Sequence, residues 1–135
     1  MAIDGLDHFT LAPADLDASR RFYVEALGLR EGDRPRFSFP GAWLDCGAAP
    51  VVHLIGDRGA AAAATGPLDH VAFRASGLAE MVARLTARGV EYELRTVPGP
   101  GLRQLFVHDP DGVKVEMNFA ASEALPEDAG GRDVG

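Results

Sequence analysis

Four side chains of this sequence have the chemistry and the spacing of a metal site. His8 and His53 are 45 positions apart, and His70 and Glu116 are 46 positions apart. Imidazole and carboxylate groups together are ligands that suit zinc, nickel, cobalt, manganese and ferrous iron. A single histidine in a strand is more often structural than a ligand, but two pairs at matched spacing predict a metal site built from equivalent positions.

A short motif that occurs twice in the chain accounts for this spacing. Residues 6–11 read LDHFTL and residues 68–73 read LDHVAF, so His8 and His70 are third in their copies. After each motif the pattern predicts an amphipathic helix and then three strands. We therefore predict an α+β fold in which the two halves of the chain repeat one βαβββ module.

The halves are expected to contain equivalent elements. In the first half these are a strand at 6–11, a helix between Asp15 and Gly28, and strands at 29–33, 36–46 and 50–56; in the second half they are a strand at 68–74, a helix at 78–88, and strands at 90–95, 102–108 and 113–119. The first module then spans 1–56, a linker 57–67, the second module 68–119, and a loosely ordered acidic tail 120–135.

The last strands of the two halves align His53 with Glu116. Glu116 stands between Val115 and Met117, in an otherwise apolar strand. An unpaired carboxylate there costs on the order of several kcal/mol, so a cation or strong hydrogen-bond donors must face it. If the halves are related by an approximate two-fold axis, both pairs of predicted ligands point into one cleft.

Composition excludes several classes of partner. The chain carries 20 acidic and 13 basic residues, a formal charge of −7, which argues against nucleic acid because that partner requires a basic surface. No apolar run approaches the roughly 20 residues that span a bilayer, so we expect no membrane segment. The single cysteine, Cys46, cannot form an internal disulfide, and this favours a cytoplasmic location.

The motifs resemble those of the vicinal oxygen chelate superfamily, which includes glyoxalase I, extradiol dioxygenases, fosfomycin-resistance enzymes, methylmalonyl-CoA epimerase and bleomycin-resistance proteins. The resemblance rests on LDHFTL, RRFYVEALGL, LDHVAFRA and QLFVHDPDGVKVEMNF, in that order within residues 3–119. It implies two tandem modules whose curved mixed sheets enclose a metal-binding cleft. It also implies that His8, His70 and Glu116 are ligands, and it places His53 where the relatives have glutamate or glutamine.

The resemblance further implies an enzyme in which a divalent ion (Fe, Mn, Ni, Zn or Co) grips two adjacent oxygens of a small substrate. We expect a glyoxalase-like lyase or isomerase, with Glu116 and His53 as catalytic groups. Specificity for glutathione is not expected, because no arginine follows the first ligand and only Arg36 or Arg103 could substitute. Related single chains often pair their modules across a subunit interface, so a homodimer is expected.

Two other functions stay open. An extradiol ring-cleaving dioxygenase with Fe(II) is compatible with the ligands, but Phe106 stands where that group has a tyrosine, and residues 97–101 contain no histidine. A metal-free drug-binding protein of the bleomycin-resistance type would carry no ligands at these positions. A metal titration distinguishes this last class from the enzymes, because a drug-binding protein does not need the ion.

The walls of the predicted cleft come from two equivalent strands. Phe37, Phe39 and Trp43 are expected on the strand of the first half, and Gln104 and Phe106 on that of the second. Arg103 or Gln104 is a candidate for orienting an oxyanion of the substrate.

Overall fold

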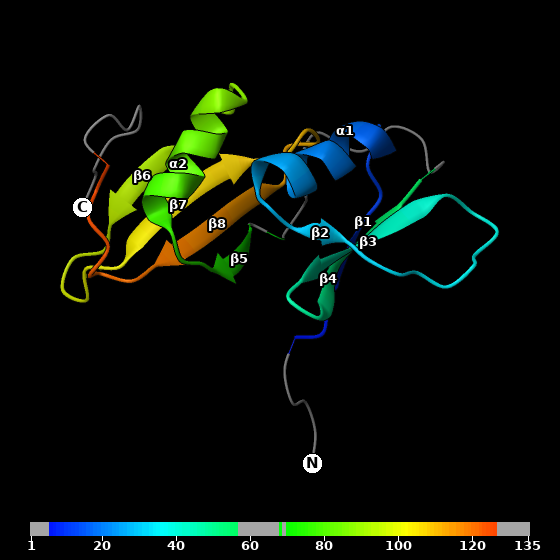
Figure 1. The fold of residues 1–135 in the computed structure, drawn as a ribbon, viewed down its shortest axis with the longest axis horizontal. Helices are drawn as coiled ribbons and strands as arrows, with labels where there is room; N and C mark the ends of the chain where they lie inside the picture. Colours follow the sequence, from blue (N-terminus) through cyan, green and yellow to red (C-terminus); the bar gives the residue numbers. More distant parts are fainter. Residues whose placement is uncertain (1–5, 57–67, 69, 127–135) are drawn as a thin grey trace, which may run out of the picture. The chain divides into compact units, whose positions relative to one another are not determined.

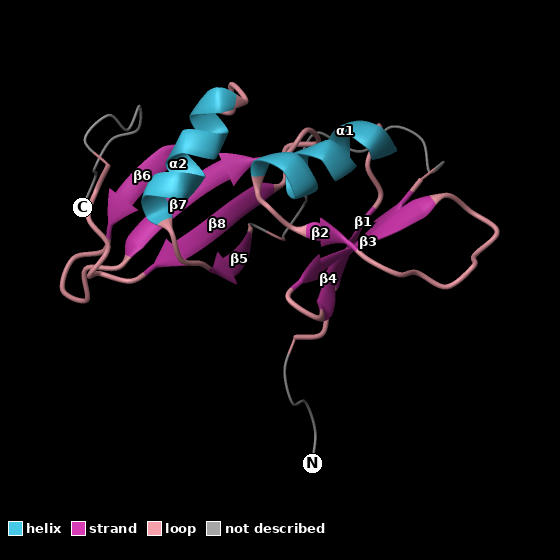
Figure 2. Cartoon of the chain, in the orientation of Figure 1, coloured by secondary structure: helices cyan, strands magenta, loops and turns pink. Residues whose placement is uncertain are grey.

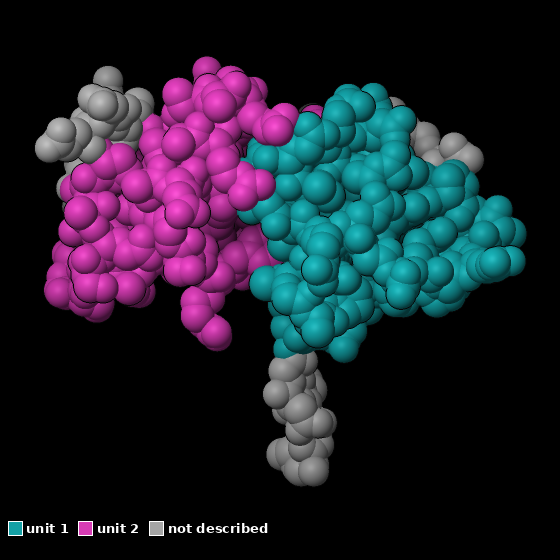
Figure 3. All heavy atoms as spheres, in the orientation of Figure 1, with its two compact units in different colours: residues 1–62 teal, residues 63–135 magenta. Residues whose placement is uncertain are grey.

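The structure is a computed structural model of the chain, and it describes residues 6–56, 68 and 70–126. The chain divides into two compact units, Met1–Ala62 and Ala63–Gly135 (Figure 3). The predicted linker, 57–67, lies outside the described residues, and each unit is described by itself. Among the described residues, no helix has both the length and the apolar character needed to cross a membrane.

The first unit is a four-stranded mixed sheet with one helical segment (Figure 1). The strand order is β1-β4-β3-β2, with β1 parallel to β4 and the other pairs antiparallel. Asp15 begins the helical segment, because its carboxylate accepts a hydrogen bond from the backbone N–H of Ala18. The elements are β1 (Phe9–Leu11), α1 (Leu16–Arg21), a π-helical turn η1 (Phe22–Ala26), β2 (Arg30–Glu31), β3 (Gly41–Cys46) and β4 (Ala49–Ile55).

The second unit has the same plan (Figure 2). Its strand order is β5-β8-β7-β6, with β5 parallel to β8 and the other pairs antiparallel. One helix, α2, lies across a face of this sheet (Figure 2). The elements are β5 (Val71–Arg74), α2 (Leu78–Ala87), β6 (Glu93–Thr96), β7 (Arg103–His108) and β8 (Lys114–Phe119).

Both units therefore follow the predicted order of one strand, one helix and three strands, and the predicted α+β fold is confirmed; the two sheets are not closed. The strand register supports the predicted equivalence of residues in the two halves. Thr10 of β1 pairs with His53, and Ala72 of β5 pairs with Glu116. His53 and Glu116 thus hold the same position on the last strand of their sheets.

Alternation along these last strands separates the core from the polar face. In β8, Val115, Met117 and Phe119 are buried, whereas Glu116 and Asn118 between them are half-buried. Because successive side chains point to opposite faces of a sheet, Glu116 and Asn118 share the face opposite the core. His53 alternates in the same way with the buried residues of β4.

One prediction about the first sheet is wrong. Phe37 and Phe39 lie in the connection between β2 and β3, not on a strand. Pro35 and Pro40 flank them, and proline has no backbone N–H to give to a sheet ladder. The N–H of Phe37 is used locally instead, in a hydrogen bond of 2.9 Å to the carbonyl of Pro35.

A residue beyond the last strand caps α2. The helix is preceded by Gly77 in the left-handed conformation (φ 82°), which offers no side chain to the first N–H groups. The carboxylate of Glu123 accepts hydrogen bonds from the N–H of Gly77 (3.1 Å) and of Leu78 (2.7 Å). The predicted tail, 120–135, is described only as far as Pro126, and within that part Glu123 is fixed by these bonds.

Candidate functional site

His70 and Glu116 form a pair in the second unit. His70 lies just before β5, and Glu116 lies on β8, the strand paired with β5. The His70 Nε2 atom is 3.3 Å from Glu116 Oε1, and the Glu116 side chain is only 12% exposed. A carboxylate with so little contact with water is stabilised by groups that offer positive charge or hydrogen-bond donors.

The second carboxylate oxygen of Glu116 faces two carboxamides. Asn118 Nδ2 donates to Glu116 Oε2 at 2.7 Å, and Gln104 Nε2 lies 3.4 Å from the same oxygen. Gln104 is a predicted residue of the site, whereas Asn118 is not. Its position two residues after Glu116 was the available signal, because strand residues two apart share a face.

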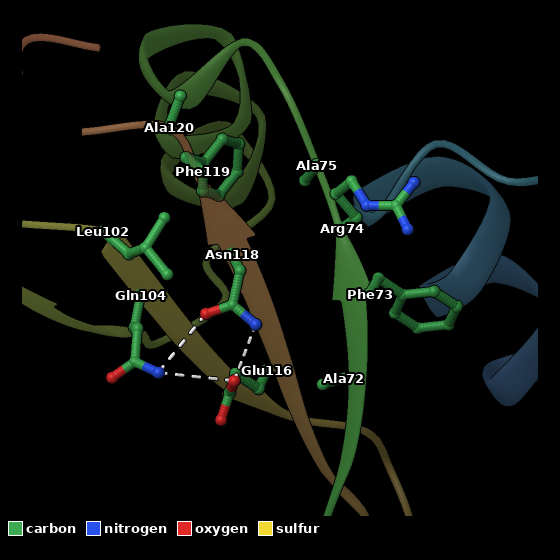
Figure 4. A pocket seen from close by; sticks show the side chains of 10 residues that line it. All are labelled: Ala72, Phe73, Arg74, Ala75, Leu102, Gln104, Glu116, Asn118, Phe119 and Ala120. Carbon is green, nitrogen blue, oxygen red and sulfur yellow. Dashed lines mark hydrogen bonds between the residues drawn. The ribbon is translucent and has the colours of Figure 1, made fainter. Parts of the chain in front are cut away.

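A pocket of about 620 Å³ opens beside this carboxylate, and the described residues that line it belong to the second unit (Figure 4). Glu116, Asn118 and Gln104 form its polar part. The rest of its wall is mainly apolar, and among the described residues that line it Arg74 is the one cation. The lining residues are Ala72, Phe73, Arg74, Ala75, Leu102, Gln104, Glu116, Asn118, Phe119 and Ala120.

In the first unit, His8 is oriented by the residue before it. His8 Nδ1 is 2.6 Å from the carboxylate oxygen Oδ2 of Asp7. An ionised carboxylate can only accept, so Nδ1 carries the proton and the neutral ring has its lone pair on Nε2. Histidines that bind metals commonly have this arrangement, in which an outer carboxylate fixes the tautomer.

His53 is packed between two rings. Its imidazole stacks on His8 with 3.7 Å between centroids, and on Trp43 with 4.0 Å. Its Nε2 lies 3.1 Å from the carbonyl oxygen of Pro50, which can only accept, so Nδ1 keeps the lone pair. Burial lowers the pKa of His53 and the nearby His8 lowers it further, which favours a neutral ring.

The four predicted ligands thus occur as two pairs, one in each unit. His8 and His53 are in ring contact, and His70 and Glu116 are within 3.3 Å of one another. Within the part of the chain that the structure describes, no group of three or more histidine, cysteine, aspartate or glutamate side chains is gathered as a metal site.

The aromatic residues of the first unit continue the stack that begins at His8. Trp43 lies beside Phe37 at 6.4 Å, and Phe37 stacks on Phe39 at 5.0 Å, between ring centroids. The guanidinium of Arg34 stands 4.9 Å and 5.1 Å from these two phenyl rings. Phe37 is 44% exposed, so this aromatic row presents a ring to solvent.

The other predicted substrate residues lie in the second unit and differ in their roles. Arg103 is held by the hydroxyl of Thr96 at 2.8 Å and the carbonyl of Glu123 at 3.2 Å. Phe106 is buried and does not line the pocket, and Arg95 and Lys114 stand over its ring. Of these residues, Gln104 is the one that lines the described pocket.

The chain is similar to known proteins over most of its length. A family model described as the Glyoxalase/Bleomycin resistance protein/Dioxygenase superfamily matches residues 5–117. The protein Glyoxylase I 4 of Arabidopsis thaliana is 30% identical over 123 residues, which cover 85% of this chain and 70% of that protein. Both matches extend across the two repeated halves.

Solved structures have the same fold. A glyoxylase/bleomycin resistance protein/dioxygenase domain from Frankia sp. EAN1pec superposes with a TM-score of 0.72 at 24% identity, over 88% of this chain and 99% of that one. TnmS3, an antibiotic binding protein from Streptomyces sp. CB03234, superposes with a TM-score of 0.64 at 25% identity, over 89% of this chain and 98% of its own.

Proposed function

The chain belongs to the Glyoxalase/Bleomycin resistance protein/Dioxygenase superfamily, and we propose that it is a metal-dependent enzyme of this superfamily, a glyoxalase-like lyase or isomerase. Its substrate is a small molecule that binds through two adjacent oxygen atoms. The observation that carries the proposal is Glu116, a carboxylate 12% exposed, paired with His70 beside a pocket.

We propose that His8, His53, His70 and Glu116 are ligands of a divalent ion. The donor atoms suit this role, because His8 offers Nε2, His53 offers Nδ1, and Glu116 Oε1 already faces a histidine. Three imidazoles and one carboxylate fit Fe, Mn, Ni, Zn or Co. When bound, the ion would act as a Lewis acid toward an oxyanion of the substrate.

In this proposal Oε1 of Glu116 would also loosen from the ion during turnover and move a proton of the substrate. A carboxylate at the polar end of an apolar pocket is poised to take a proton from a substrate carbon and return it to a neighbouring atom. His53 would be the second candidate when its Nδ1 atom is not on the ion, because its lowered pKa keeps that lone pair available at neutral pH. Arg74 is the one cation among the described residues that line the pocket, so we propose a substrate with few anionic groups.

The proposal is tested by purifying the protein without oxygen and measuring its metal content. We expect about one ion per chain, and we expect His8→Ala and Glu116→Ala each to lose it, because the ligands come from both halves. Iron as the retained metal would favour a ring-cleaving dioxygenase over a lyase or isomerase. Failure of the native protein to bind any of the five metals would contradict the proposal.

A second candidate function is the binding of an aromatic drug without a metal. The row from Trp43 to the exposed Phe37 favours it, because flat rings stack on such a surface. The similarity to the antibiotic binding protein TnmS3 is in line with this candidate. Tight drug binding by metal-free protein, lost in Phe37→Ala and unaffected in Glu116→Ala, would support it over the enzyme.

We also propose that the protein is a homodimer. Light scattering on the purified protein tests this, and a mass of 14.3 kDa, that of one chain, would contradict it.

A further inference from the structure

The chain contains one asparagine and one glutamine, and both lie next to Glu116. Gln104 of β7 and Asn118 of β8 are register partners in the antiparallel ladder. Glu116 is two residues before Asn118 and therefore projects from the same face. The only two carboxamide side chains in the sequence thus converge on the one carboxylate among the described residues that line this pocket (Figure 4).

The three side chains form a directed network. Asn118 Nδ2 donates to Glu116 Oε2 at 2.7 Å, while Asn118 Oδ1 accepts from Gln104 Nε2 at 3.3 Å. A flipped Asn118 amide would place its oxygen against the carboxylate and its NH₂ group against that of Gln104. Gln104 therefore fixes the orientation of Asn118, and Asn118 fixes the carboxylate.

The two carboxylate oxygens of Glu116 have different partners. Oε2 is occupied by Asn118 at 2.7 Å and by the longer contact from Gln104 at 3.4 Å. Oε1 lies on the side of His70, at 3.3 Å from its Nε2. A charge-assisted bond as short as that from Asn118 is strong enough to hold the carboxyl group in one orientation.

We propose that Asn118 is a positioning residue that presents Glu116 to a divalent ion through Oε1 alone, with Gln104 supporting it. The inference rests on the proposed function, because it assigns Asn118 a role toward the ion. It specifies that Glu116 contributes a single oxygen to the ion and keeps the other for its amide partner. Groups that orient a metal ligand in this way typically change affinity by about 10–100-fold when they are removed.

A merely structural role for Asn118 predicts something different. Its amide would then only satisfy a half-buried carboxylate in the metal-free protein, and removing it would lower stability without changing the affinity for metal. Metal affinity and metal-free stability, measured on the same variants, distinguish these two roles.

The experiment is isothermal titration of metal-free protein with Zn²⁺, Ni²⁺, Co²⁺ and Mn²⁺. Asn118→Leu is nearly the same size but cannot donate, and we expect it to raise the Kd of the ions that bind by about 10–100-fold. Asn118→Gln retains the carboxamide and should recover most of this loss. Gln104→Leu should raise the Kd less than Asn118→Leu, because its contact with Oε2 is the longer one.

The controls are Glu116→Gln and its double variant with Asn118→Leu. If Asn118 acts through the carboxylate, the second substitution adds little further loss of affinity once the carboxylate is gone. Thermal melting without metal shows whether Asn118→Leu folds. If it folds poorly, the Kd for metal is compared between Gln104→Leu and Asn118→Gln instead. An unchanged Kd in Asn118→Leu, beside a native protein that binds metal, would overturn this inference alone. A native protein that binds none of these ions would overturn the proposed function as well.

Discussion

Replacing Glu123 with alanine should destabilise the second unit by removing the cap of α2. The carboxylate receives the N–H groups of Gly77 and Leu78, and Gly77 has no side chain that could replace it. Loss of a capping side chain costs about 0.5–2 kcal/mol, and loss of a negative charge at a helix N-terminus about 0.3–1 kcal/mol. Since Glu123 is half-buried and the exposed N–H groups regain some water, we expect a loss of about 1.5 kcal/mol in the free energy of unfolding.

Urea unfolding followed by circular dichroism measures this loss. Glu123→Gln keeps an acceptor oxygen but not the charge, and it should lose about half as much. Glu91→Ala removes an exposed carboxylate from the loop before β6 and should stay within about 0.5 kcal/mol of the native protein. If Glu123→Ala is as stable as the control Glu91→Ala, Glu123 does not cap α2.

Three further predictions concern the proposed metal ligands. Glu116→Ala should abolish metal retention and any activity, and stoichiometric metal in that variant, measured by elemental analysis, would remove Glu116 from the site. Stripping the metal with a chelator should lower stability, by about 2.7 kcal/mol when the free ion had been at a hundred times its Kd, and calorimetry with and without chelator measures this. In the metal-free protein, NMR titration should show the pKa of His53 below 6.5. The free energy of unfolding should then increase as the pH rises from that lowered pKa to 6.5, and decrease as the pH falls through the same window. His8→Asn should raise the pKa of His53, because it removes a like charge.

The duplicated plan was predictable because it depends on local patterns that occur twice. The repeated LDH motif marked the start of each module, and alternation of apolar residues located strands such as β8 to within a residue or two. The equivalence of His53 and Glu116 followed from counting along these strands. The register of the two sheets agrees with that count.

Other features were not predicted, because they depend on local backbone geometry or on contacts with distant residues. Phe37 and Phe39 alternate like strand residues, but two prolines keep their segment out of the sheet. The tautomer of His53 depends on the carbonyl of Pro50, which is reached only when the strand is formed. Likewise the cap on α2 comes from Glu123, 46 positions after Gly77, a distance over which sequence carries no capping signal.

The strand order has a consequence for how each half acquires its structure. In both sheets the final strand lies between the first strand and the third, so the first strand has no partner until the whole module has been synthesised. Pairing β1 with β4 closes a loop of about 40 residues, a step that lowers chain entropy before its contacts form. Each half should therefore assemble in one cooperative event, triggered when its last strand inserts.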